Sequence, residues 1–216
     1  MTIRNAASMG LHGSTWNTRG YCGQGQVAEL IGSLAGRSAL VCGNAAGVFA
    51  EVEQALSLVT SPVIFAVNDV GMYLPHVDHW VSLHTDKLGT WRSVRWAEHT
   101  QKESTQYHSD AARPFVDWTW QHLTPQFCLS GYFAMQVAWI MGCEHIVLCG
   151  CPGDATPRFF EAQARESFGY GSHDRGSDRA VREQLQYEMA RLPDFKAAVR
   201  SMSGWTQSYF GGLEEG

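Results

Sequence analysis

Short apolar runs alternate along the chain with stretches whose apolar residues recur every three or four positions. The runs predict strands buried on both faces of a sheet, and they cover residues 38–42, 63–67, 79–83 and 145–149, with a last strand over 197–202. The helical spacing predicts helices over residues 26–34, 48–59, 87–96, 130–141 and 178–192. This alternation predicts a Rossmann-like three-layer α/β domain with a mostly parallel sheet.

The segment 130–141, SGYFAMQVAWIM, carries the strongest helical pattern of the chain. Gln136 is the single polar residue of its interior, so we expect this helix to be buried on every side. Ser130, Ala134 and Ala138 fall on one face of the helix. Side chains this small let another backbone, or a ligand at the N-terminus of the helix, approach closely.

The segments between these elements differ in composition. Residues 1–24 are polar and rich in glycine, and we expect an irregular lead-in there. Residues 155–177 are polar, glycine-rich and aromatic, which is typical of a flexible lid. Residues 98–125 leave two alternatives open, short edge strands or a long loop. No internal repeat divides the chain, so we predict a single domain over residues 1–216.

Composition argues against several classes of protein. Of the 216 residues 44% are apolar, and the formal net charge is −5. This balance argues against a dedicated nucleic-acid surface, which usually needs a basic stripe. No apolar run approaches the length that spans a bilayer, and the first residues lack the pattern of a signal peptide. The six cysteines form no CxxC pair, so we expect buried, reduced thiols in a cytoplasmic protein.

Polar and turn residues follow four of the predicted strands. They are Gly43-Asn44, Asn68-Asp69, His84-Thr85-Asp86 and Gly150 to Asp154. Ordinary turn chemistry explains each group when it is taken alone, because Gly, Asn and Asp are common turn residues. Ligands of parallel α/β sheets, however, bind beyond the carboxyl ends of the strands. Four polar groups at one edge of a sheet therefore favour a polar binding site.

Two places in the chain offer the N-terminus of a predicted helix to a phosphate group. The turn from Gly43 to Gly47 precedes one helix, whose first N–H groups could hold a phosphate. This turn is neither GxGxxG nor a Walker loop. Ser130-Gly131 begins the second helix, as a hydroxyl cap with exposed amides or as a plain N-cap.

Histidines supply the candidates for acid–base chemistry. His76, His79 and His84 show neither HExxH nor HxH spacing, so no metal site is predicted from them. His84 stands at a strand end, where it could contact a ligand or act as a base. His173 lies in the predicted lid, either as a base that closes over a substrate or as an ordinary loop histidine.

The order of these motifs resembles that of the family 42 sialyltransferases. It also resembles the related superfamily of motility accessory factors and archaeal 6-hydroxymethylpterin diphosphokinase-like proteins, and small phage and bacterial proteins look similar. The resemblance covers residues 38–154 and rests on Gly43-Asn44, on Asn68-Asp69 and on the pattern SGxxAxxxAxxxGxxxIxLxG from Ser130 to Gly150.

The resemblance implies a nucleotide bound across these loops, without a metal. Gly43, Asn44 and Asn68 match the positions that hold CMP in the sialyltransferases, and the Ser-Gly at residue 130 matches a donor contact. The lid would carry the histidine base, here His173.

The chain departs from the family pattern in two places. The first turn lacks the serine of the usual Gly-x-Gly-Pro-Ser. The segment from Gly150 to Asp154 has two residues more than the usual Gly-Ile-Asp, so Asp154 need not occupy the family position.

We therefore favour a glycosyltransferase-like enzyme that passes a sugar from a nucleotide-activated donor to a hydroxyl acceptor. His173, His84 and Asp154 are its catalytic candidates, and helix N-termini would steady the leaving phosphate. No cofactor is predicted beyond this nucleotide-sugar substrate. One alternative is phosphoryl or pyrophosphoryl transfer with Mg²⁺ held by Asp69, Asp86 and Asp154. The other is a nucleotide-binding module without catalysis. The nucleotide base, the sugar, the acceptor and the oligomeric state stay open.

Overall fold

The computed structural model describes residues 27–98, 104–120, 123, 129–154, 159 and 178–213. The predicted lead-in at 1–24 lies outside these described residues, as does the predicted lid at 155–177 apart from Phe159. No helix in the described part of the chain is long and apolar enough to cross a membrane.

The described residues form one parallel sheet of seven strands, in the order β5-β4-β3-β2-β1-β6-β7. The strands are β1 (Ser38–Cys42), β2 (Val63–Val67), β3 (His79–Val81), β4 (Gln106–Ser109), β5 (Trp118–Thr119), β6 (His145–Cys149) and β7 (Val199–Ser201). The three-layer α/β prediction is confirmed, and the parallel pairing extends to every described strand.

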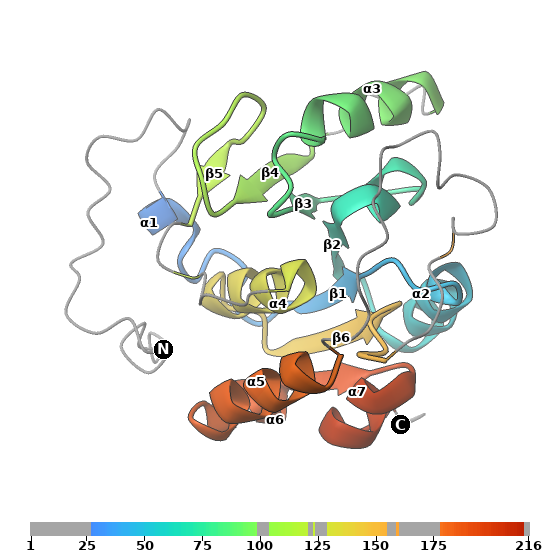
Figure 1. The fold of residues 1–216 in the computed structure, drawn as a ribbon, viewed down its shortest axis with the longest axis vertical. Coiled ribbons are helices and arrows are strands. Elements are labelled where there is room, and N and C mark those ends of the chain that lie inside the picture. The colour runs from blue at the N-terminus through green and yellow to red at the C-terminus, as the bar shows by residue number, and fades with distance from the viewer. Residues whose placement is uncertain are drawn as a thin grey trace.

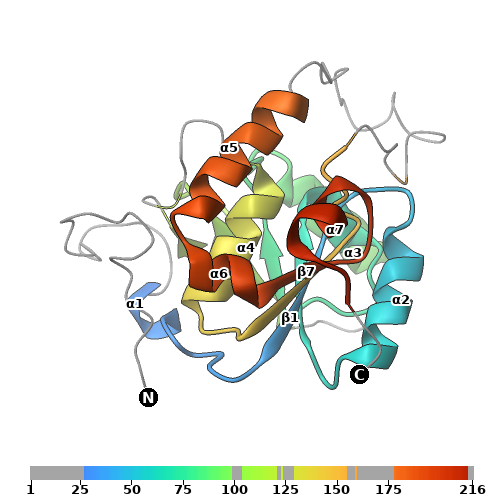
Figure 2. The same ribbon diagram turned by 90° about the horizontal axis from the view of Figure 1, so that it is seen from below.

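Helices cover both faces of this sheet, as Figures 1 and 2 show. They are α1 (Val27–Leu30), α2 (Val48–Leu58), the 3-10 helix η2 (Asn68–Met72), α3 (Leu88–Glu98), α4 (Ser130–Ile140), α5 (Asp178–Ala190), α6 (Pro193–Ala198) and α7 (Gly204–Phe210). Strand residues such as Val41 and Phe65 pack with α4, α5 and α6, whereas Leu40 and Ile64 pack with α2 and α3. Alternate residues of each strand therefore enter two separate cores.

Helix α4 is buried along its length, as its apolar pattern predicts. The sheet lies on one side of it, and α5 and α6 pack against the other, where Trp139 stacks on Phe195 with ring centroids 5.2 Å apart. Gln136 is itself only 5% exposed. This helix is therefore the centre of one core, and its first turn is fixed relative to the ends of the strands.

Several boundaries differ from the predictions. Helix α1 ends at Leu30, four residues early, because Gly32 adopts a φ of +73° that a continuing helix does not allow. Residues 98–125 contain the short strands β4 and β5. Three helical elements, η2, α6 and α7, were not predicted, since each is too short to show a clear helical period.

A buried polar chain crosses the β3 and β4 side of the sheet. Trp120 Nε1 donates to His108 Nδ1 at 3.0 Å, so the proton of His108 lies on Nε2, from which it is donated to His79 Nδ1 at 2.9 Å. Trp120 and His108 are fully buried. Burial lowers the pKa of His79 to about 4 and holds that of His108 well below its usual value.

Candidate functional site

The ends of four neighbouring strands form a polar row at the carboxyl edge of the sheet. In spatial order the row runs from β3 (His84) through β2 (Asn68-Asp69) and β1 (Gly43-Asn44) to β6 (Gly150). The order of the strands reverses between β1 and β6, which is where ligands of such sheets bind. Because strands lie about 4.8 Å apart, the end of β3 is about 10 Å from that of β1.

Gly43 and Gly150 serve the packing of the chain itself. A Cβ atom added at Gly43 would lie 2.5 Å from Cys151 Sγ and 2.5 Å from the carbonyl oxygen of Gly150. Gly150 has a φ of +63°, and an added Cβ would lie 2.6 Å from Val48 Cβ. Both glycines are buried, and the Gly43 amide donates to the carbonyl of Cys149 at 2.7 Å. The close approach of β1 to the end of β6 explains both of them without a ligand.

Asn44 joins the end of β1 to the segment that follows β2. Its Nδ2 donates to Asp69 Oδ1, and its Oδ1 accepts the amide hydrogen of Val70 at 3.3 Å. Asp69 is 1% exposed, whereas Asn44 is half-buried. These two predicted ligand contacts therefore meet each other, and they hold the turns after β1 and β2 together.

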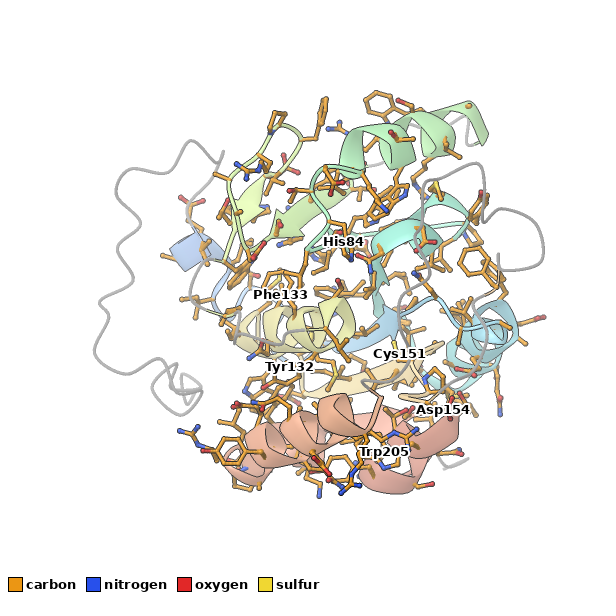
Figure 3. All side chains as sticks on the ribbon, viewed as in Figure 1. His84, Tyr132, Phe133, Cys151, Asp154 and Trp205 are labelled. Carbon is orange, nitrogen blue, oxygen red and sulfur yellow. The ribbon has the colours of Figure 1, made fainter. Side chains whose placement is uncertain are left out.

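Asn68 joins β2 to β3 in a similar way. Its φ is +58°, a conformation that asparagine tolerates, and its Oδ1 accepts the Ser82 hydroxyl at 2.8 Å. The Ser82 oxygen in turn accepts the backbone amide of His84 at 2.8 Å. His84 itself is exposed, and Figure 3 shows it above the N-terminal part of α4. This chain of hydrogen bonds fixes the backbone from which the histidine projects.

The N-terminus of α2, the first predicted phosphate position, lies beside a carboxylate. Glu51, in the first turn of α2, accepts the amide of Gly150 at 2.6 Å through Oε2. Its Oε1 would lie 3.3 Å from a Cβ added at Gly47. This negative charge already interacts with the positive end of the helix dipole, so a second anion is disfavoured there.

The N-terminus of α4 differs from that of α2. Leu129 is the N-cap residue and no side chain caps the helix, so the predicted hydroxyl cap by Ser130 is wrong. Among the described residues, a Cβ added at Gly131 would meet only Cys151 Sγ, at 3.8 Å, which is an ordinary van der Waals distance. Alanine would therefore fit at Gly131, and the packing of the described residues does not explain why glycine stands there.

Cys151 lies between the N-terminus of α4 and the end of β1 (Figure 3). Its thiol points to the carbonyl oxygen of Val41, 3.8 Å away. Burial, and then the proximity of Cys149 and Glu51, raise the pKa of this thiol to about 12. The group is therefore protonated at neutral pH and is not an activated nucleophile.

The segment from Cys151 to Asp154 leads away from β6 toward α7. The Thr206 hydroxyl donates to the Cys151 carbonyl at 2.7 Å, and the Thr206 amide donates to the Pro152 carbonyl at 3.0 Å. Asp154 Oδ2 lies beside Gly204, where an added Cβ would come within 2.7 Å of it. Asp154 is thus at the start of α7, as Figure 3 shows, and not beside His84.

Sequence reasoning missed one charged residue at this edge. Arg182 of α5 donates from Nε to the Gly153 carbonyl at 2.6 Å, and its Cζ lies 5.4 Å from the ring centroid of Trp205. In the sequence Arg182 stands within the predicted helix over residues 178–192 and outside every motif named above. No local pattern relates Arg182 to Gly153, because α7 and the end of β6 meet only in the folded chain.

The structure brings all seven of the predicted nucleotide-binding residues to one edge. Gly43, Asn44, Asn68, Asp69, Ser130, Gly131 and Gly150 all lie there. His173 lies outside the described residues. In the described ranges, no group of three or more His, Cys, Asp or Glu side chains is arranged to hold a metal ion.

Comparisons with known proteins give no match: no protein-family model fits the chain, and no curated protein is similar to it in sequence.

Proposed function

We propose that the chain is a glycosyltransferase-like enzyme that binds a nucleotide-activated sugar where β1 and β6 diverge. One observation carries the proposal: the first turn of α4 holds a glycine that the packing of the described residues does not require, at the switch point of a parallel sheet. Glycine in the middle of a helix costs about 0.5–1 kcal/mol relative to alanine, which is an upper bound for Gly131 as the second residue of α4. Close approach of a ligand to the backbone is a reason for glycine at this position.

A phosphate group suits this position. The first N–H groups of a helix have no partner within the helix, and the helix dipole favours negative charge at this end. The 11 residues of α4 are held in the core, so these donors do not reorganise when a ligand arrives. Transfer of a sugar leaves negative charge on the phosphate of the donor, and fixed donors stabilise that charge as it develops.

The acceptor hydroxyl needs a base near this phosphate. His84 is the described candidate, since its side chain is exposed and its backbone is fixed by Ser82. His173 stays the base that the sequence predicts. The alternative Mg²⁺ reaction is supported less, because Asp69 is buried against Asn44 and Asp154 lies at α7.

A thermal-shift screen tests this proposal. The protein is heated with CMP, UDP, GDP, ADP, CTP or ATP, each in Mg²⁺ and in EDTA. A nucleotide at a hundred times its Kd should stabilise the fold by about 3 kcal/mol, which a melting curve resolves. We expect a shift with a mono- or diphosphate that persists in EDTA. A triphosphate shift that EDTA abolishes would favour phosphoryl transfer, and the absence of any shift would refute nucleotide binding.

A further inference from the structure

Arg182 is held at the carboxyl edge by two contacts from different elements. Its Nε–H donates to the carbonyl of Gly153 at 2.6 Å, four residues after the end of β6. Its guanidinium carbon lies 5.4 Å from the ring centroid of Trp205 on α7. A hydrogen bond through Nε and an aromatic contact together fix the plane of a guanidinium group.

The ring that carries Arg182 is itself supported. Trp205 stacks on Tyr209 with centroids 5.1 Å apart and an interplanar angle of 7°, and Lys196 Nζ lies 4.2 Å from the Tyr209 centroid. A Cβ added at Gly153 would lie 2.9 Å from Trp205 Cε3, so the turn and the ring are in tight contact. The Trp205 ring that Arg182 contacts is therefore held in place, although Arg182 itself is only half-buried.

The terminal nitrogens of Arg182 make no hydrogen bond or ion pair with any described residue. Other described arginines donate hydrogen bonds from their terminal nitrogens to carbonyl groups of the chain. Arg95 Nη1 donates to the carbonyls of Gly71 and Leu74, both at 2.7 Å, and Arg200 Nη1 donates to the carbonyl of Val199, also at 2.7 Å. Arg182 thus presents a fixed fork of donors, which is the geometry that binds a phosphate or carboxylate in two places.

The segment 151–153 connects this fork to the N-terminus of α4. Cys151 is next to Gly131, and Gly153 binds Arg182. Because the Cα atoms of residues 151 and 153 are at most about 7 Å apart, both contacts belong to one short segment of the chain.

We propose that Arg182 binds the second anionic group of the donor, while the N-terminus of α4 binds the first phosphate. This inference rests on the proposed function and extends it to the class of donor. The second group is either the β-phosphate of a nucleoside diphosphate sugar or the carboxylate of an acidic sugar attached to a nucleoside monophosphate. Both present paired oxygens to the guanidinium fork.

Calorimetric titration of the full chain with matched ligands tests the assignment. The ligands are CMP, UMP, GMP and AMP, the corresponding diphosphates, and CMP linked to a carboxylated sugar. The variants are R182Q, R182K and the control R179Q, which removes the same charge from the same helix. Arg179 is 90% exposed at its side chain and is paired with Glu183 at 2.7 Å, so its loss should not affect the site.

We expect R182Q to weaken the ligand with two anionic groups by about ten- to hundredfold, the range for a charge-assisted hydrogen bond. Binding of the monophosphate should change less than about twofold, and R182K should fall between R182Q and wild type. Diphosphates and the carboxylated sugar distinguish the two sources of the second anion. Melting temperatures of the variants confirm that each has folded.

Three results would overturn the inference in distinguishable ways. If the wild type binds mono- and diphosphates equally well and R182Q changes neither, Arg182 has no ligand and the proposed function stands. If R179Q weakens binding as much as R182Q, only the general charge of α5 matters. Failure of the wild type to bind any of these ligands would remove the proposed function and this inference together.

Discussion

The buried histidines make the stability of the fold depend steeply on pH. His79 is 6% exposed, stacks on Phe65 at 4.5 Å and accepts a hydrogen bond from His108. Burial lowers its folded pKa to about 4, against about 6.5 in an unfolded chain. Between these two pKa values the unfolded state binds a proton at His79 and the folded state does not. The contribution of His79 to the free energy of unfolding is therefore complete above pH 6.5 and is lost as the pH falls toward 4.

The size of this loss follows from the two pKa values. The difference between the folded and unfolded pKa values of His79 corresponds to about 3 kcal/mol in the free energy of unfolding. About 2 kcal/mol of this is lost between pH 7 and pH 5. His108 is fully buried and its pKa is also depressed, so it adds a loss of the same sign. The H79Q substitution removes one titrating group but keeps an acceptor for His108.

Urea denaturation of wild type and H79Q at pH 7 and pH 5 measures this contribution. We expect the free energy of unfolding to fall by about 2 kcal/mol less in H79Q than in wild type over this interval. The control is H145Q, whose histidine is exposed at the start of β6. Equal losses in wild type and H79Q, within about 0.5 kcal/mol, would refute the burial argument.

Three further experiments probe the carboxyl edge of the sheet. G43A should destabilise the fold by about 1–3 kcal/mol, because the added Cβ would lie 2.5 Å from the backbone oxygen of Gly150; urea denaturation that shows no loss would contradict this packing. Adding C151A to G43A should recover only part of the loss, since the carbonyl contact stays; full recovery would assign the whole clash to the thiol. The alkylation rate of Cys151, followed by mass spectrometry, should rise about tenfold per pH unit up to pH 10, because its pKa is about 12; a plateau near pH 9 would show an ordinary thiol.

Strands with apolar runs, such as residues 38–42 and 63–67, could be predicted from the sequence with their observed boundaries. Their residues are buried on both faces, so hydrophobicity alone marks them. Strand β4 carries His108 and Ser109, and β5 consists of Trp118 and Thr119 alone, so neither shows an apolar run. The buried His108 has His79, 29 residues away, as a hydrogen-bond partner. Local sequence contains no signal of that kind.

The candidate site was predictable as a set of strand ends but not in its detail. Residues after parallel strands must share one edge, which is why Asn44 and Asp69 were identified together. That Asn44 bonds Asp69, or that Gly43 makes room for Cys151, depends on packing between strands. The contrast between Gly43 and Gly131 therefore appears only when an added Cβ atom can be placed in the structure.

The G131A substitution, compared with G47A, tests the central claim most directly. Both variants add one methyl group at a helix N-terminus, but Glu51 lies beside Gly47, whereas Cys151 is the one described residue within 4 Å of a Cβ added at Gly131. We predict that G131A raises the free energy of unfolding by at most about 0.5–1 kcal/mol and yet weakens nucleotide binding by at least about tenfold. G47A should leave that binding unchanged. Nucleotide affinity that is the same in G131A as in wild type would contradict a phosphate site at the first turn of α4.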